Sequence, residues 1–433
     1  MQTPSILLRG LPPAIADAPD GRDEWARSPL SSLSDAALIE AVAAAIERPK
    51  READSSFLTH APLELAARAA LLTAVAPAAR DQARRRIAAI AADYGRAGEE
   101  IEDRPGDYED TGAAIAAARG ALLEGDAEAL DGALLYLDRR VSPLAIRAAL
   151  ADDIMPMLGA AAHAPILLAE LPRLEARLAN ATRLLRAPLR MIARLSKARL
   201  SWFDSAANDS APDEGGALFD ALRAPPPVRS PSLYIAPTML AIEANGFAGD
   251  MLADATAGLT VDAARRAILR AGALSMLQDD PEHAPYGWSH ALTMPQGVLA
   301  CAAAVADKRK AVRIAATHAL GLRATLGKAR LLDAPPLRPR TEELFDVPPI
   351  EAAGAIYHAD DGTVALMKSM LATRAATHRD AHLAKYTLAA FDAAARDPEA
   401  ARLFLAAAAY LGAWWDARPQ ASFEESPDHP ADS

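Results

Sequence analysis

The chain of 433 residues is long enough for one large domain or for two to three ordinary ones, and 51% of it is hydrophobic. Its formal net charge of −11 argues against a nucleic-acid partner, which would require a basic face. The single cysteine, Cys301, excludes an intrachain disulfide, a cysteine-rich zinc site and a cysteine-ligated iron–sulfur cluster.

The elements that the sequence predicts are helices. Alanine, leucine, arginine and glutamate are good helix formers, whereas β-branched residues are sparse, so the pattern indicates an all-α protein. Helical periodicity is found at Asp35–Glu47, Pro62–Ala74, Ala79–Tyr94, Thr111–Leu123, Pro143–Leu150, Ala164–Leu185, Pro188–Ser201, Pro237–Ala244, Val261–Leu277, Met294–Ala306, Lys310–Thr325, Ala365–Leu371, His378–Ala395 and Ala400–Trp415. Helix-start signals are present at Ser34-Asp35, Thr59 and Asp397-Pro398.

The breaks between these helices are rich in Pro, Gly, Asp and Ser. Glu99–Asp110 is predicted to be an acidic loop, and Asp204–Gly216 and Ala224–Pro231 to be surface loops. Because no break resembles an interdomain linker, we expect a single large helical domain over residues 1–415. Residues 416–433 are polar and acidic, which favours a disordered tail.

The N-terminal segment and the longest apolar stretches indicate where the protein is located in the cell. Met1–Pro13 lacks a basic segment followed by a long apolar run, so no signal peptide is expected. Apolar stretches such as Ala406–Trp415 are too short to cross a bilayer. We therefore expect a cytoplasmic protein with no membrane partner.

Histidine is scarce, at nine residues, and two of the nine open a repeated phrase. His60-Ala61-Pro62-Leu63 and His163-Ala164-Pro165-Ile166 lie about a hundred residues apart, which indicates either a duplicated helical half or a chance match in an alanine-rich chain. Scarce histidines at the heads of apolar helices suggest a buried metal or proton-transfer site.

A third candidate segment begins at His378. The helix expected there places His382 and Lys385 one turn apart on one face, with His378 four residues before His382. A buried lysine tends to be a neutral amine, which can take up carbon dioxide to give a carboxylate-like carbamate ligand. The alternatives are that Lys385 extends to solvent or pairs with an aspartate, and that His378 is simply solvated.

Two further histidines have both functional and structural interpretations. His60 and Glu64 form an i, i+4 pair suited to iron, manganese or zinc, unless Glu64 instead pairs with Arg68. His290 lies at a loop-to-helix junction beside Trp288, where it either serves a site or packs and caps.

These phrases, in this order, resemble the questin-oxidase-like family: His60-Ala-Pro-Leu, then His290-Ala-Leu-Thr, then His382-Leu-Ala-Lys385. The resemblance implies a mostly helical enzyme that oxidises or opens quinone-type rings at a non-haem Fe(II). It implies imidazole ligands and a carboxylated lysine, which here are His60, His163, His290, His382 and Lys385. Glu64 stands where the family has a second histidine, so Glu64 and His378 are additional candidates.

The resulting hypothesis is a mono- or dioxygenase that uses O2, with NADPH or another external reductant as the candidate electron source. Its substrate would be a small aromatic or polyketide-like molecule, and inward-pointing side chains of several helices would form the site. Trp288, Gln296 and Tyr386 are the predicted pocket wall. The alternatives are a zinc-dependent hydrolase with the same ligands and a non-catalytic helical scaffold.

Overall fold

The computed structural model describes residues 7–8, 11, 15–16, 19–51, 56–175, 177–178, 181–195, 197–202, 214–228, 235–327 and 329–418. Within these residues the secondary structure is helical, apart from isolated bridges such as the antiparallel one between Lys50 and Glu100, so the predicted all-α class is confirmed. The chain forms two compact units, residues 1–197 with 376–384 and residues 198–375 with 385–433. The single domain expected over residues 1–415 stays a prediction.

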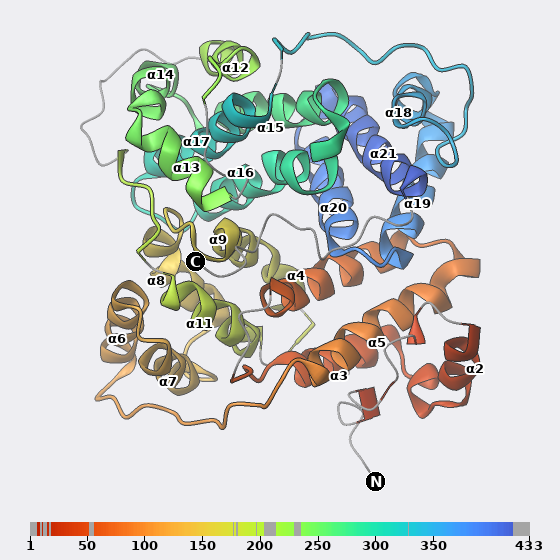
Figure 1. The fold of residues 1–433 in the computed structure, drawn as a ribbon. Helices are drawn as coiled ribbons and strands as arrows, with labels where there is room; N and C mark the ends of the chain where they lie inside the picture. Colours follow the sequence, from red (N-terminus) through yellow and green to blue (C-terminus); the bar gives the residue numbers. More distant parts are fainter. Residues whose placement is uncertain are drawn as a thin grey trace. The chain divides into compact units, whose positions relative to one another are not determined.

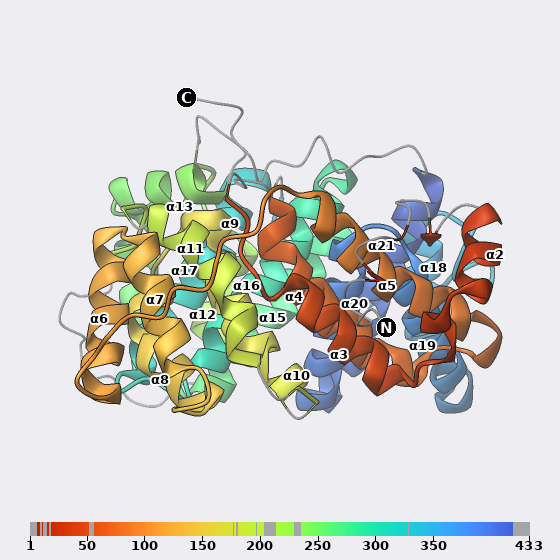
Figure 2. The same ribbon diagram turned by 90° about the horizontal axis from the view of Figure 1, so that it is seen from below.

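The first unit contains the N-terminal helices (Figure 1). They are α2 (Pro19–Arg27), α3 (Asp35–Ile46), α4 (Ser56–Leu71), α5 (Arg80–Arg96), α6 (Thr111–Glu124), α7 (Ala127–Leu137), α8 (Pro143–Ile154), α9 (Gly159–Glu170), α10 (Pro172–Glu175) and α11 (Arg186–Arg194). Helix α4 packs against α3, α5, α9 and α11, and α6 pairs with α7 (Figure 2). Segment 376–384, which includes the first turn of α20, belongs to the same unit.

The second unit contains the remaining helices, apart from the last two residues of α19 and the first turn of α20. They are α12 (Gly216–Arg223), α13 (Ile235–Ala244), α14 (Phe247–Ala255), α15 (Val261–Gln278), α16 (Ser289–Cys301), α17 (Lys308–Leu326), α18 (Pro349–His358), α19 (Asp361–Thr377), α20 (Ala381–Arg396) and α21 (Ala401–Ala417). Within it, α15, α16 and α17 pack on one another and α18 packs along α21. Small side chains permit these close approaches: a Cβ added to Gly272 of α15 would lie 2.6 Å from the Ala291 carbonyl oxygen of α16.

The predicted start of the helix near Pro62 was wrong. Helix α4 begins at Ser56, so Pro62 lies in its interior and His60 in its second turn. Thr59 does not cap the helix, because its buried hydroxyl faces the Met191 Sδ at 3.2 Å. Pro62 costs α4 one backbone hydrogen bond, because proline has no N–H to donate. The burial of residues on several sides of α4 therefore stabilises the helix by more than this loss.

The long helix predicted over Ala164–Leu185 was also wrong. It is divided into α9, α10 and a 3-10 turn, and Pro172 marks the second start. At the beginning of α9, the backbone at Ala160, Ala161 and Ala162 is left-handed, with φ of 50°, 50° and 56°. A left-handed run of three alanines has no sequence signal, because this conformation normally selects glycine.

Several other predicted boundaries of helices and loops lie closer to the observed ones. Ser34 caps α3 as predicted, whereas the Asp397 carboxylate binds Arg270 instead of capping a helix. Residues 99–110 form the predicted irregular loop. Helix α16 begins at Ser289 rather than Met294, and the short helices α2, α7, α12, α14 and α18 were not predicted.

The predicted tail begins too early. Asp416 is helical, in α21, and pairs with Arg374. Residues 419–433, and residues 204–213 and 229–231 of the two predicted surface loops, lie outside the described residues. Among the residues that the structure does describe, no helix combines the length and apolar character needed to cross a bilayer.

Candidate metal centre

Three of the predicted ligands meet inside the first unit. His60 comes from α4, His163 from α9 and His382 from the first turn of α20, and each is at most 2% exposed. Each offers one ring nitrogen such that the three atoms lie within 4.8 Å of one another. Segments that are about a hundred and about two hundred residues apart in sequence thus converge on one point.

The distances suit ligands of one ion. The Nε2 atoms of His60 and His163 are 2.8 Å apart, and the ring of His60 lies 4.5 Å from that of His163 and 5.0 Å from that of His382, centroid to centroid. Two nitrogens at roughly 2.1 Å from a metal, on neighbouring coordination positions, are about 3 Å apart. The observed spacing therefore matches adjacent imidazole ligands, and the same two atoms can share a proton when no ion is present.

Hydrogen bonds to the other ring nitrogens fix two of the imidazoles. The Nδ1–H of His163 donates to the Ala160 carbonyl at 2.8 Å, and the Nδ1–H of His382 donates to the Asp380 carboxylate at 3.1 Å. Both rings therefore keep Nε2 as the atom with a lone pair. Carbonyl and carboxylate partners of this kind orient metal-binding histidines and raise their basicity.

Asp380 has two roles at the start of α20. One carboxylate oxygen accepts the His382 backbone N–H at 2.7 Å, which caps the helix, and also accepts the His382 ring. Burial raises the pKa of this carboxyl, but His382 and His378 lower it more, to about 2. Asp380 is therefore an anion at neutral pH, which stabilises a positive charge in the cluster.

Arg68 connects α4 to the segment that carries His382. Its fully buried guanidinium donates to the Ala376 carbonyl at 2.9 Å, to the Arg379 carbonyl at 3.5 Å and to Glu64 at 2.6 Å. Burial lowers the pKa of Arg68, while Glu64 raises it. Glu64 thus forms the Arg68 pair predicted as its alternative role, and the described cluster does not include it.

The predicted position of His378 in the helix was wrong. Helix α20 begins at Ala381, so His378 precedes it and is not one turn before His382 on the same helix. Its Nδ1 accepts the Asp380 backbone N–H at 3.1 Å. The capping carboxylate of Asp380 sets the helix start three residues later than predicted.

The other predicted site residues belong to the second unit. His290 is buried in α16 and its Nδ1 faces the Tyr286 carbonyl, and Lys385 is buried in α20, one turn after His382. Trp288 is fully buried and donates to the Asp280 carbonyl, and Gln296 donates to the Ala389 carbonyl. Tyr386 is buried, which raises the pKa of its hydroxyl. Their roles in a site stay predictions.

Sequence reasoning missed Asp380 and Ala160 as partners of the imidazole rings, and it identified Arg68 only as an ion-pair partner of Glu64. Asp380 had a usable signal, since an aspartate just before an apolar helical segment is a favoured cap. Comparison with known protein families, with curated proteins and with solved structures finds no match to this chain.

Proposed function

We propose that His60, His163 and His382 bind one divalent metal ion and that the chain is a non-haem iron oxygenase acting on an aromatic, quinone-type substrate. The observation that carries the proposal is the convergence of three buried imidazoles within 4.8 Å of one another. The oxygenase assignment rests on the resemblance of the histidine and lysine phrases to the questin-oxidase-like family.

The residues present fit a metal ion. Imidazole nitrogens are good ligands for iron, zinc and copper, and two of these three rings have their Nδ1 atoms bound to protein acceptors. A bound cation supplies the partner that all three Nε2 lone pairs can share.

Fe(II) held by imidazoles supplies one-electron and O2 chemistry when bound. The protein's part is to position the ligands and exclude water. Ala61, Leu63, Ala164 and Ile166, which flank His60 and His163 along their helices, are at most 4% exposed. Asp380 keeps the His382 ring oriented through the hydrogen bond to Nδ1.

Lys385 is the proposed carbamate ligand. It lies three residues after His382 in α20 and is 7% exposed. A buried amine loses part of its preference for the charged form, which favours reaction with carbon dioxide. The carbamate role of Lys385, the ligand role of His290 and the external reductant rest on the resemblance to the questin-oxidase-like family.

A zinc-dependent hydrolase is the second candidate, and one observation favours it. The described cluster consists of three imidazoles without a carboxylate, a set that also holds catalytic zinc. Metal identity and oxygen consumption separate the two activities.

The deciding experiment measures the metal content of the purified protein by mass spectrometry after anaerobic loading with Fe(II) or Zn(II). Wild type and the control His358→Ala, which changes a histidine outside the cluster, should bind one ion per chain. His60→Ala, His163→Ala and His382→Ala should lose it. Full metal content in the three cluster variants would refute the site, and tight zinc without oxygen uptake would refute the oxygenase.

Asp380→Asn tests the positioning role. We expect metal affinity to fall by about 10- to 100-fold, the usual effect of losing such a partner. The asparagine can still accept the His382 backbone N–H, so the start of α20 should persist. Unchanged metal affinity in this variant would show that Asp380 serves the helix alone.

A further inference from the structure

A second concave site in the first unit is built from arginines. A cavity of about 500 Å³ lies between the irregular loop at 101–104, α7 and α11. Four guanidinium groups line it, together with three carboxylates: Arg51, Arg104, Arg190, Arg194, Glu102, Glu128 and Asp131. None of these residues belongs to the histidine cluster, so the site is separate from the proposed metal centre.

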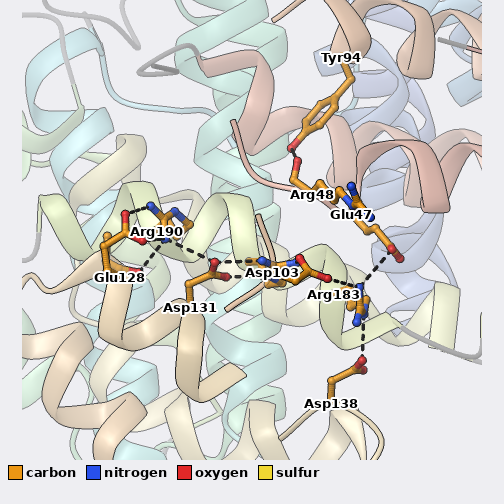
Figure 3. A network of polar contacts seen from close by, with 11 residues as sticks. Glu47, Arg48, Tyr94, Asp103, Glu128, Asp131, Asp138, Arg183 and Arg190 are labelled. Carbon is orange, nitrogen blue, oxygen red and sulfur yellow. Dashed lines mark hydrogen bonds and ion pairs between the residues drawn. The ribbon is translucent and has the colours of Figure 1, made fainter. Parts of the chain in front are cut away.

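Two of the lining residues, Asp131 and Arg190, belong to a network of buried ion pairs (Figure 3). Asp131 and Arg186, whose side chains are 5% and 1% exposed, form two hydrogen bonds of 2.7 and 3.0 Å. Asp131 also lies 3.4 Å from Arg190, so the two arginines share its charge. Arg190, 4% exposed at its side chain, is further held by a 3.1 Å hydrogen bond to the Ala127 carbonyl.

Glu128 is the carboxylate that meets this cationic surface. Its side chain is 75% exposed and binds both terminal nitrogens of Arg190 (Figure 3). The bonds from Arg190, with the charges of Arg190, Arg194 and Arg104, lower the pKa of Glu128 against the opposing effect of its partial burial. One exposed carboxylate thus lines the pocket together with several cations.

The remaining pairs around the pocket are weak. Arg104 meets Glu102 at 3.4 Å and Arg51 meets Glu99 at 3.7 Å, and all four side chains are well exposed. Exposed pairs of this type contribute little, so they leave the guanidinium groups available to a ligand. A planar guanidinium fork binds carboxylate and phosphate groups with two parallel hydrogen bonds.

We propose that this pocket binds a small oxyanion ligand, a molecule with a carboxylate or phosphate group, which displaces the Glu128 carboxylate from Arg190. The buried Asp131–Arg186 pair preorganises Arg190, and Arg104 and Arg194 contact the rest of the ligand. Glu128 acts as an internal competitor that covers the arginine when the pocket is empty. The volume of the cavity suits a metabolite-sized molecule rather than a macromolecule.

The test is isothermal titration calorimetry with inorganic phosphate and, separately, with succinate as the carboxylate probe. Wild type should bind at least one of them saturably, and the tighter one identifies the class. Glu128→Gln removes the competing charge while keeping the side-chain shape, and should tighten binding about tenfold, the value of one charge-assisted hydrogen bond. The control Glu124→Gln removes the same charge from an exposed position in α6 and should match wild type.

Arg104→Gln is the opposite test, because Arg104 is exposed and its loss should spare the fold. We expect it to weaken binding several-fold, whereas the control Arg140→Gln should not. Absence of saturable binding of both probes would overturn the proposal. Equal affinities for wild type, Glu128→Gln and Glu124→Gln would overturn it too, since a merely structural Glu128 would not compete with the ligand.

Discussion

His318 should make the stability of the protein depend on mildly acidic pH. It lies in α17 with no exposed surface, and neither ring nitrogen has a hydrogen-bond partner among the residues that the structure describes. Burial lowers its pKa from 6.5 to about 4. The folded protein therefore resists protonation of this ring over a range in which the unfolded chain accepts the proton.

The sign and size of the pH effect on the unfolding free energy follow from the linkage between proton binding and folding. Because the folded pKa is lower, the stabilising contribution is complete above pH about 6.5 and is lost as the pH falls towards 4. The drop in the pKa of His318 from 6.5 to about 4 corresponds to about 3 kcal/mol of unfolding free energy at most, and most of it should be lost by pH about 4.5. That is a large share of the stability of an ordinary domain.

Urea denaturation of wild type and His318→Leu at about pH 7 and about pH 4.5 measures the effect, because leucine has similar volume and no titrating group. Both proteins lose stability in acid through their carboxylates, so the informative quantity is the difference between them. On acidification, the unfolding free energy of His318→Leu should rise relative to that of wild type by about 2 kcal/mol. Parallel losses in both proteins would refute the reasoning.

Two further predictions concern the first unit. Asp131→Ala should lower the free energy of unfolding by about 3–5 kcal/mol, because it leaves the buried Arg186 guanidinium without its two-bond partner, whereas Asp103→Ala at the more exposed end of Arg186 should cost much less. Denaturant titrations compare them, and equal losses would contradict the argument. Ala161→Gly should raise the unfolding free energy by about 1 kcal/mol, since its φ of 50° strains an alanine. The matched Ala117→Gly, at a similarly half-buried position in the interior of α6, should lower it by a similar amount, and a loss in both variants would show that Ala161 is not strained.

The fold class followed from the sequence because composition decides it. Alanine-rich segments with few β-branched residues have no alternative to helix, and most long helices were found near their observed bounds. The errors arose where tertiary burial overrode local signals. Pro62 was expected to open a helix and instead lies within α4, and Asp380 was not recognised as the cap that begins α20 at Ala381.

The three histidines of the cluster could be predicted from the sequence, but whether Glu64 joins them could not. Scarcity and the repeated His-Ala-Pro phrase singled out His60 and His163, and the late His382 phrase added the third. The spacing of Glu64 and Arg68 allowed two interpretations, a ligand or an ion pair. Only the structure could distinguish them, because the buried guanidinium of Arg68 binds the 376–379 backbone as well as Glu64.

The backbone partner that orients the His163 ring could not be predicted from the sequence. His60 and His163 head identical tripeptides, but their backbones differ: the chain before His60 is a regular helix, whereas that before His163 is left-handed over three alanines. That turn aims the Ala160 carbonyl at His163 Nδ1, so a backbone atom fixes the tautomer. A carbonyl oxygen exists at every position of every sequence, so its use as a partner can be recognised only once the strained turn is seen.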